Sequence, residues 1–199
     1  QCPIISGKAD KCLKCEPCAV MEGIAGAGAF SDGKYIISTE YGGWLPDFME
    51  PAKVMDYIEQ ADQVLMRFGA QKERFVPNDE LKQLCLRYDL HMQQAQLKHL
   101  GTDANLKTMQ RLVDDLKQRV QIETLCTVTD VNKETHEVFF THRGKQYSVV
   151  GDKVVFAVGR AGSRVFLDWC KRNGVACANN QVDIGVRVEL PAMVWEHFS

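Results

Sequence analysis

The sequence predicts an α+β fold, with helices mainly in its first half and strands mainly in its second. Three observations predict it. Apolar residues recur every three or four positions between 51 and 120, and after that the spacing changes to every second position. An apolar run at 153–158 is then followed by glycines and a further helical stretch. No internal repeat interrupts this order.

Three helices are expected in the first half. The first begins at Pro51, which suits a first helical turn, and stops at Gly69. The second begins at Pro77-Asn78-Asp79, and the segment 90–99 that comes after it is expected to be extended. The third follows Gly101-Thr102-Asp103, where the hydroxyl or the carboxylate can cap the first turn.

An antiparallel meander is expected next. Alternation of apolar and polar residues predicts a strand at 120–128, and Asn132-Lys133-Glu134 is typical of a turn. Strands at 137–142 and 146–150, joined by a turn at 143–145, complete the meander.

A strand, a glycine turn and a helix follow the meander. The run 153–158 is apolar on both faces, as expected of a strand covered on two sides. It leads through the turn 159–163 into a helix at about 164–173, which is half of a nucleotide-binding unit. Alternation at 182–190 predicts a last strand with one buried face.

Length and composition are those of an ordinary globular protein. Of the 199 residues, 45% are hydrophobic and 25% are charged, so the chain can bury a sizeable core. Its formal charge of −2 gives no global basic field, and we therefore expect neither nucleic acid nor an anionic membrane as a partner. No apolar run reaches the length of a membrane span.

A cysteine-rich segment opens the sequence. Cys12-x-x-Cys15-x-x-Cys18, with Cys2 ten residues upstream, supplies four thiols that could close one tetrahedral site. Zinc accepts four thiolates at such spacings, and the compact triplet also suits an iron–sulfur cluster. The alternative is a loop of reduced thiols without a metal. The other four cysteines stand singly among apolar neighbours, which favours a reducing, cytoplasmic setting.

Small residues dominate the segment 26–34, Gly-Ala-Gly-Ala-Phe-Ser-Asp-Gly-Lys. It resembles Gly-x-Gly-x-x-Gly, but Ser31 takes the place of the third glycine and no expected strand leads into it, so it is not a dinucleotide fingerprint. Small residues in series still let backbone amides approach a flat or anionic ligand, and Asp32 and Lys34 can hydrogen-bond to one. The alternative is a glycine-rich surface turn without a ligand.

Taken in order, five segments resemble the bacterial FAD-dependent dehydrogenases, which are flavoproteins with two dinucleotide-binding domains related to glutathione reductase. The segments are Gly-Ala-Gly-Ala-Phe-Ser-Asp-Gly-Lys at 26–34, His-Leu-Gly-Thr-Asp at 99–103, the meander of 120–150, Val-Val-Phe-Ala-Val-Gly-Arg-Ala-Gly-Ser at 154–163 and Val-Asp-Ile-Gly-Val-Arg-Val-Glu at 182–189. The resemblance covers essentially the whole chain, including the cysteine-rich lead, which occurs in one branch of the family.

The resemblance implies a three-layer FAD-binding fold interrupted by a helical cap or substrate domain. The resemblance implies four parts. The first two are a cysteine-rich lead with the flavin-contacting loop at 1–34 and a mainly helical cap at 35–119. The other two are the meander and returning strand–helix of the FAD domain at 120–181 and the start of a substrate-domain strand at 182–199. Its implied FAD-binding residues are Gly26, Ala27, Gly28, Ala29, Phe30, Ser31, Asp32 and Lys34 beside the ring, Thr127 and Val128 beside the adenine, and Ala157, Val158, Gly159 and Arg160 in the second flavoprotein signature.

Two elements of the family are absent from these residues: the opening strand with Gly-x-Gly-x-x-Gly and the carboxy-terminal Gly-Asp segment. FAD recognition depends on the pyrophosphate at a helix N-terminus. We therefore expect the chain to be the central part of a longer protein and to bind flavin weakly or not at all by itself.

The predicted function is that of an FAD-dependent oxidoreductase, in which hydride passes through the flavin to or from a small-molecule substrate. A nicotinamide nucleotide is a candidate electron partner, and no residue is assigned as the catalytic acid or base. The alternative is a non-catalytic α+β interaction module in which Cys2, Cys12, Cys15 and Cys18 hold zinc. In either case, uncovered apolar surface could pair between copies of the chain.

Overall fold

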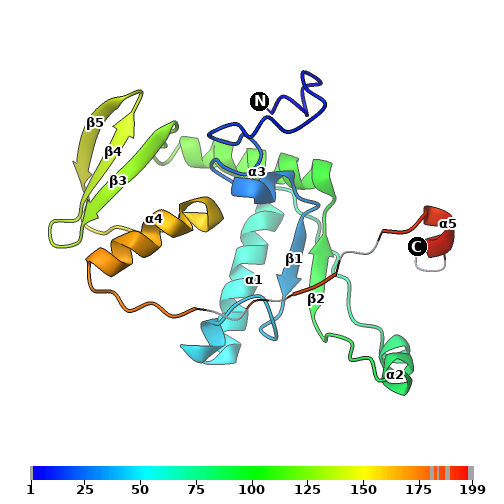
Figure 1. Cartoon of the computed structure of the whole chain (residues 1–199). Helices are drawn as coiled ribbons and strands as arrows, with labels where there is room; N and C mark the ends of the chain where they lie inside the picture. Colours follow the sequence, from blue (N-terminus) through cyan, green and yellow to red (C-terminus); the bar gives the residue numbers. More distant parts are fainter. Residues whose placement is uncertain (1, 180–181, 183, 187–188, 197–199) are drawn as a thin grey trace. The chain divides into compact units, whose positions relative to one another are not determined.

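A computed structural model describes residues 2–179, 182, 184–186 and 189–196 of the chain (Figure 1). Its contacts divide the chain into two units. The first unit comprises Gln1–Val128 and Phe140–Tyr147, and the second comprises Thr129–Phe139 and Ser148–Ser199. Helices and two small antiparallel sheets make up the described elements, which confirms the α+β class.

The three helices expected in the first half are confirmed. They are α1 (Pro51–Arg67), α2 (Asp79–Arg87) and α3 (Thr102–Lys117). The Asn78 side chain caps α2 by accepting a hydrogen bond of 2.9 Å from the Leu81 amide. The expected cap of α3 by Thr102 or Asp103 is wrong: both residues already lie inside the first turn, and Gly101, with a φ of 79°, precedes the helix without a side-chain cap.

A two-stranded antiparallel sheet lies beside α1 (Figure 1). It pairs β1 (Lys34–Ile37) with β2 (Gln96–His99), so that Lys34 stands opposite His99. Only the last four residues of the segment expected to be extended, 90–99, form a strand. Two short 3-10 helices, η1 (Gly26–Phe30) and η2 (Leu45–Asp47), come before and after β1 in sequence.

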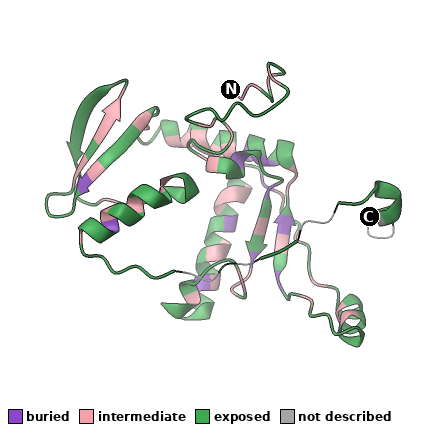
Figure 2. Cartoon of the chain, in the orientation of Figure 1, coloured by how far each residue is buried: buried purple, intermediate pink, exposed green. Residues whose placement is uncertain are grey.

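The core of the first unit combines apolar and polar side chains. Ile37 of β1 and Val54 of α1 are buried, and so are the polar residues Asp62, Lys98 and Asn105 (Figure 2). Burying polar groups is costly unless they are paired. The first unit is therefore built around a small number of polar contacts that the helical periodicity alone does not indicate.

The second sheet has the order β3-β4-β5 and contains β3 (Cys126–Asn132), β4 (Glu137–His142) and β5 (Lys145–Val150). β4 is as predicted, and β5 starts one residue earlier. The strand expected at 120–128 is wrong for residues 120–125, which form no strand, whereas β3 continues to Asn132. Leu125, whose φ of 57° is not that of an extended chain, separates residues 120–124 from the start of β3.

The strand expected at 153–158 is also wrong, since no strand forms there. A strand buried on both faces needs partner strands, and the part of the second unit that is described offers none beside this run. Val155 is 86% exposed, while the Phe156 ring packs 4.8 Å from both Phe166 and Trp169. These two rings belong to α4 (Gly159–Arg172), which begins about five residues before the expected helix and absorbs the expected glycine turn at 159–163.

The final strand expected at 182–190 has three residues, 183, 187 and 188, outside the described residues, and its other residues form no strand. Val182 and Ile184 are 79% and 92% exposed instead of alternating with a buried face. A short helix, α5 (Ala192–Trp195), follows. Among the helices of the described residues, none is both long enough and apolar enough to cross a bilayer.

Candidate functional site

The segment 26–34 was expected to be a loop throughout, but it contains the 3-10 helix η1 and, at Lys34, the first residue of β1. This small-residue loop, as the segment is called below, is held from behind by the buried side chain of Asn105 on α3. Asn105 is 0% exposed. Its Nδ2 donates to the Gly28 carbonyl at 2.7 Å and to the Ser31 carbonyl at 3.3 Å, while its Oδ1 accepts from the Tyr35 hydroxyl at 2.5 Å. A single amide thus joins α3, the loop and β1.

The loop is packed on one side and open on the other. Ala29 is buried, and a Cβ built on Gly33 would stand only 2.8 Å from the Asn105 Cβ. Gly33 also has a φ of 65°, where glycine is favoured. By contrast, a Cβ on Gly26 or Gly28 would meet nothing within 4 Å. The open side can therefore be approached closely by a flat ligand.

Charged side chains lie at the end of the loop. Asp32 Oδ2 is 3.2 Å from Lys34 Nζ and 3.4 Å from His99 Nε2. The hydrogen bond from Lys34, together with the charges of Lys34 and His99, lowers the pKa of Asp32, so this carboxylate is anionic at neutral pH. The amides of Leu100 and Gly101 bond the carbonyls of Gly33 and Asp32, which ties this end to the start of α3.

These residues fit the role that the family resemblance implies for them. A planar ring system such as a flavin needs a smooth backbone surface that does not collapse, and here the Asn105 hydrogen bonds fix the backbone from the far side. The space beside Gly28 is free of protein atoms within 4 Å of an added Cβ. Lys34, with its exposed ammonium group, is a donor available to polar ring atoms or phosphate.

The other residues expected to bind FAD belong to β3 and to the segment around the start of α4. Thr127 and Val128 are exposed near the start of β3 and belong to the first unit. Ala157, Val158, Gly159 and Arg160 lie at the start of α4, in the second unit, and all four are exposed. For these six positions, the FAD contacts remain a prediction.

In the part of the cysteine lead that the structure describes, residues 2–22 form no helix or strand. Cys12 and Cys15 are exposed, whereas Cys2 and Cys18 are half-buried. The Cys12 sulfur accepts a hydrogen bond of 3.4 Å from the Lys14 amide. No three of these four thiols lie within 4.8 Å of one another, because the described residues contain a single cluster of that kind, which is made of other side chains. The four-thiolate site remains a prediction.

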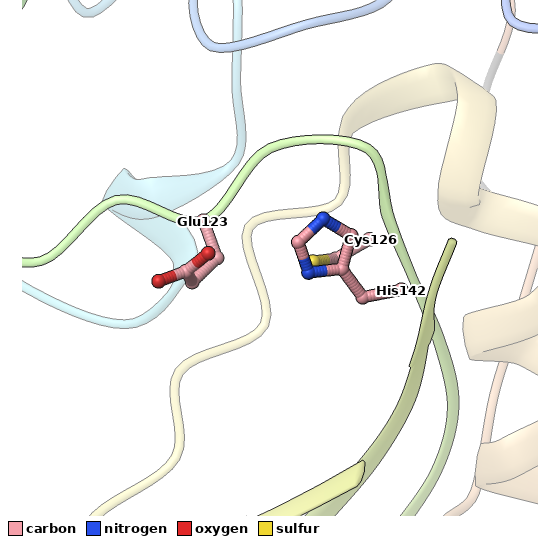
Figure 3. A group of neighbouring side chains, drawn as sticks. All are labelled: Glu123, Cys126 and His142. Carbon is pink, nitrogen blue, oxygen red and sulfur yellow. The ribbon is translucent and has the colours of Figure 1, made fainter. Parts of the chain in front are cut away.

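Sequence reasoning missed that cluster, which consists of Glu123, Cys126 and His142 (Figure 3). Its signal was the spacing Glu-x-x-Cys just before a strand, with a histidine at the end of the neighbouring strand. It also missed Asn105. The signal for Asn105 was that it lies on one face of α3 with Thr108 and Leu112. On such a face apolar residues are expected, but Asn105 and Thr108 carry an amide and a hydroxyl.

An ionic group centred on the buried side chains of Asp62 and Lys98 was missed as well. The guanidinium of Arg74 lies 2.5 Å from a carboxylate oxygen of Glu59 and 2.8 Å from one of Asp62, and Lys98 Nζ lies 2.6 Å from the other oxygen of Asp62. The hydrogen bonds that Arg74 donates to Glu59 and Asp62 raise the pKa of Arg74. This group joins α1 to β2 and to the segment between α1 and α2.

Comparison with known proteins identified no related protein. No family model, no curated protein and no solved structure matches the chain significantly.

Proposed function

We propose that this chain forms part of an FAD-dependent oxidoreductase and that its loop at 26–34 lies against the isoalloxazine ring. The observation that carries the proposal is the two-sided character of the loop: Asn105 fixes it from behind, and the face at Gly26 and Gly28 is open. The order of five sequence segments, which resembles that of the bacterial FAD-dependent dehydrogenases, supports it independently.

In this proposal the flavin, when bound, supplies hydride transfer to or from a small-molecule substrate, with a nicotinamide nucleotide as candidate electron partner. The chain contributes a surface and polar donors. Gly26, Ala27 and Gly28 present backbone to the ring, and Lys34, held by Asp32, offers a positive charge near it. Phe30, which is 40% exposed, adds apolar area at the same loop.

The proposed contribution of the remaining residues follows from the resemblance. Thr127 and Val128 would lie beside the adenine, and the segment Ala157–Arg160 would supply the second flavoprotein signature. Arg160 carries a positive charge close to the N-terminus of α4, and helix N-termini favour anionic groups such as a pyrophosphate.

The test is flavin retention by the full-length protein with Gly28 replaced. Gly28→Val should lower the flavin-to-protein absorbance ratio at least tenfold, because a branched side chain would occupy the approach to the loop. Gly43→Val is the matched control: an added Cβ also meets nothing within 4 Å there, and neither glycine has a positive φ. Its flavin content should equal that of the unmodified protein.

Two results would overturn the proposal. The first is a full-length protein that is colourless and takes up no added FAD. The second is an equal flavin content in Gly28→Val and Gly43→Val, since that would remove the loop from the flavin site. Circular dichroism of both variants separates loss of binding from loss of fold.

A further inference from the structure

We propose that Glu123, Cys126 and His142 form a zinc site in the first unit, separate from the cysteine lead and from the flavin-contacting loop. Their ligand atoms all lie within 4.8 Å of one another. Figure 3 shows the Cys126 sulfur and the His142 ring close together, with the Glu123 side chain to one side of them on the segment that precedes β3. All three residues belong to the same unit, so the site does not depend on how the two units are arranged.

The chain path brings the three residues together. Cys126 is the first residue of β3, and His142 is the last residue of its neighbour β4, so both lie at one end of the sheet. In an extended chain, residues three apart point to opposite faces. Leu125 breaks this alternation with a φ of 57°, which lets Glu123 and Cys126 share one side. Leu125 is itself 72% exposed, so burial of its side chain does not stabilise this conformation.

The ligand types match zinc. Thiolate, imidazole and carboxylate are its usual protein ligands, at about 2.3 Å for sulfur and about 2.0 Å for nitrogen or oxygen. Tetrahedral neighbours on such an ion are roughly 3.5 Å apart, so closing the observed cluster onto zinc needs side-chain shifts of roughly 1 Å. Three protein ligands leave a fourth position for water or for another ligand.

The side chains are available for this role. Cys126 and His142 are half-buried, and within the described part of the chain the His142 ring nitrogens make no hydrogen bond. The His142 ring packs against Tyr147, with centroids 6.4 Å apart, which restricts its orientation. Cys126 donates weakly to the Thr124 carbonyl at 3.5 Å, and Glu123 accepts a bond of 2.8 Å from Gln121, which orients the carboxylate.

The test titrates Co²⁺, as a coloured stand-in for zinc, into the full chain carrying Cys2→Ser, Cys12→Ser, Cys15→Ser and Cys18→Ser, so that the cysteine lead contributes no thiolate. One Co²⁺ per chain should bind, with a thiolate-to-cobalt absorption band, and zinc should displace it. Adding Cys126→Ser should abolish the band and weaken binding at least tenfold. His142→Gln should weaken binding by at least tenfold while the band persists.

Matched controls are Cys85→Ser and His136→Gln, a half-buried thiol and an exposed imidazole outside the cluster. Both should bind Co²⁺ as the background protein does. A band that survives Cys126→Ser, an equal loss of binding in the controls, or the absence of stoichiometric binding would each overturn the site. Thermal unfolding of every variant identifies any that fails to fold, and His142→Gln and Cys126→Ala then serve as independent probes.

Discussion

Lys98 Nζ lies 2.6 Å from Asp62 Oδ1, and each of these two side chains is only 1% exposed. The two atoms approach without the alignment of a hydrogen bond, so their attraction is chiefly that of opposite charges. Asp62 additionally receives a hydrogen bond of 2.8 Å from Arg74. The carboxylate therefore serves two cations, whereas Lys98 has Asp62 alone as its ion-pair partner among the described residues.

This asymmetry predicts unequal effects of substitution. Asp62→Ala should lower the free energy of unfolding by about 3–5 kcal/mol, because it leaves the Lys98 ammonium buried without a counter-charge. Lys98→Met should lower the free energy of unfolding by distinctly less. Asp62 keeps its ion pair with Arg74, and the Met side chain replaces the apolar part of the lysine side chain. Urea unfolding of the two variants measures the difference. Equal losses would contradict the assignment of Asp62 as the shared partner.

Removing the buried amide behind the loop should destabilise the first unit. Asn105→Ala leaves the Gly28 and Ser31 carbonyls and the Tyr35 hydroxyl without their partner, and a loss of about 1–3 kcal/mol is expected. Gln110→Ala, on the same helix but bonded only to Asp114 at the surface, should change stability by less than about 0.5 kcal/mol. Chemical denaturation measures the free energy of unfolding of both variants. Similar losses in Asn105→Ala and Gln110→Ala would refute the role of Asn105.

A glycine substitution tests the packed side of the loop. Gly33→Ala should destabilise the protein by about 1–3 kcal/mol, because the new Cβ meets Asn105 and the backbone has a positive φ. Gly43→Ala, with free space around its Cβ, should be neutral or slightly stabilising. The measurement is the midpoint of thermal unfolding, and a stabilised Gly33→Ala protein would rule out this packing.

The pH dependence of stability should include a contribution from Glu59. The hydrogen bond from Arg74 holds the pKa of this carboxyl below its ordinary value of 4.5. A depressed folded-state pKa adds stability that is present above the unfolded-state value and is lost as the pH falls through the folded-state value. Glu59→Gln should therefore flatten the profile below a pH of about 4.5.

The control for that measurement is Glu40→Gln, since the Glu40 side chain makes no ion pair among the described residues. Its profile of unfolding free energy against pH should follow that of the unmodified protein. The Glu59 contribution is modest because the side chain is 38% exposed and water screens the pair. A Glu59→Gln profile that is parallel to the unmodified one would contradict the prediction.

The elements that could be predicted from the sequence are those stabilised by local signals. α1 and α2 begin where a proline and a capping Asn78 indicate, and β4 and β5 follow from alternation and a tight turn. β1, a four-residue strand, carries too short a pattern to be recognised. The expected strand at 153–158 failed because an apolar run does not say which partner it will find, and here Phe156 packs on a helix instead.

In the candidate site, too, the features indicated by local sequence could be predicted, whereas those that depend on distant contacts could not. The open small-residue loop could be recognised from its composition, since glycine and alanine leave little side chain to place. Its support could not, because the contact of Asn105 with Gly28 joins residues 77 positions apart. The cluster of Glu123, Cys126 and His142 depends on a single positive φ at Leu125, which the identity of a leucine does not predict.

The order β3-β4-β5 leaves β5 at the border of its sheet, and all six of its residues are exposed, Tyr147 and Val149 among them. A border strand has backbone donors and acceptors with no neighbouring strand, and its apolar side chains favour addition of a further strand. Concentrated samples should therefore tend to form intermolecular β-structure through β5. Val149→Lys would place a charge on this strand, oppose this tendency and reduce aggregation during storage.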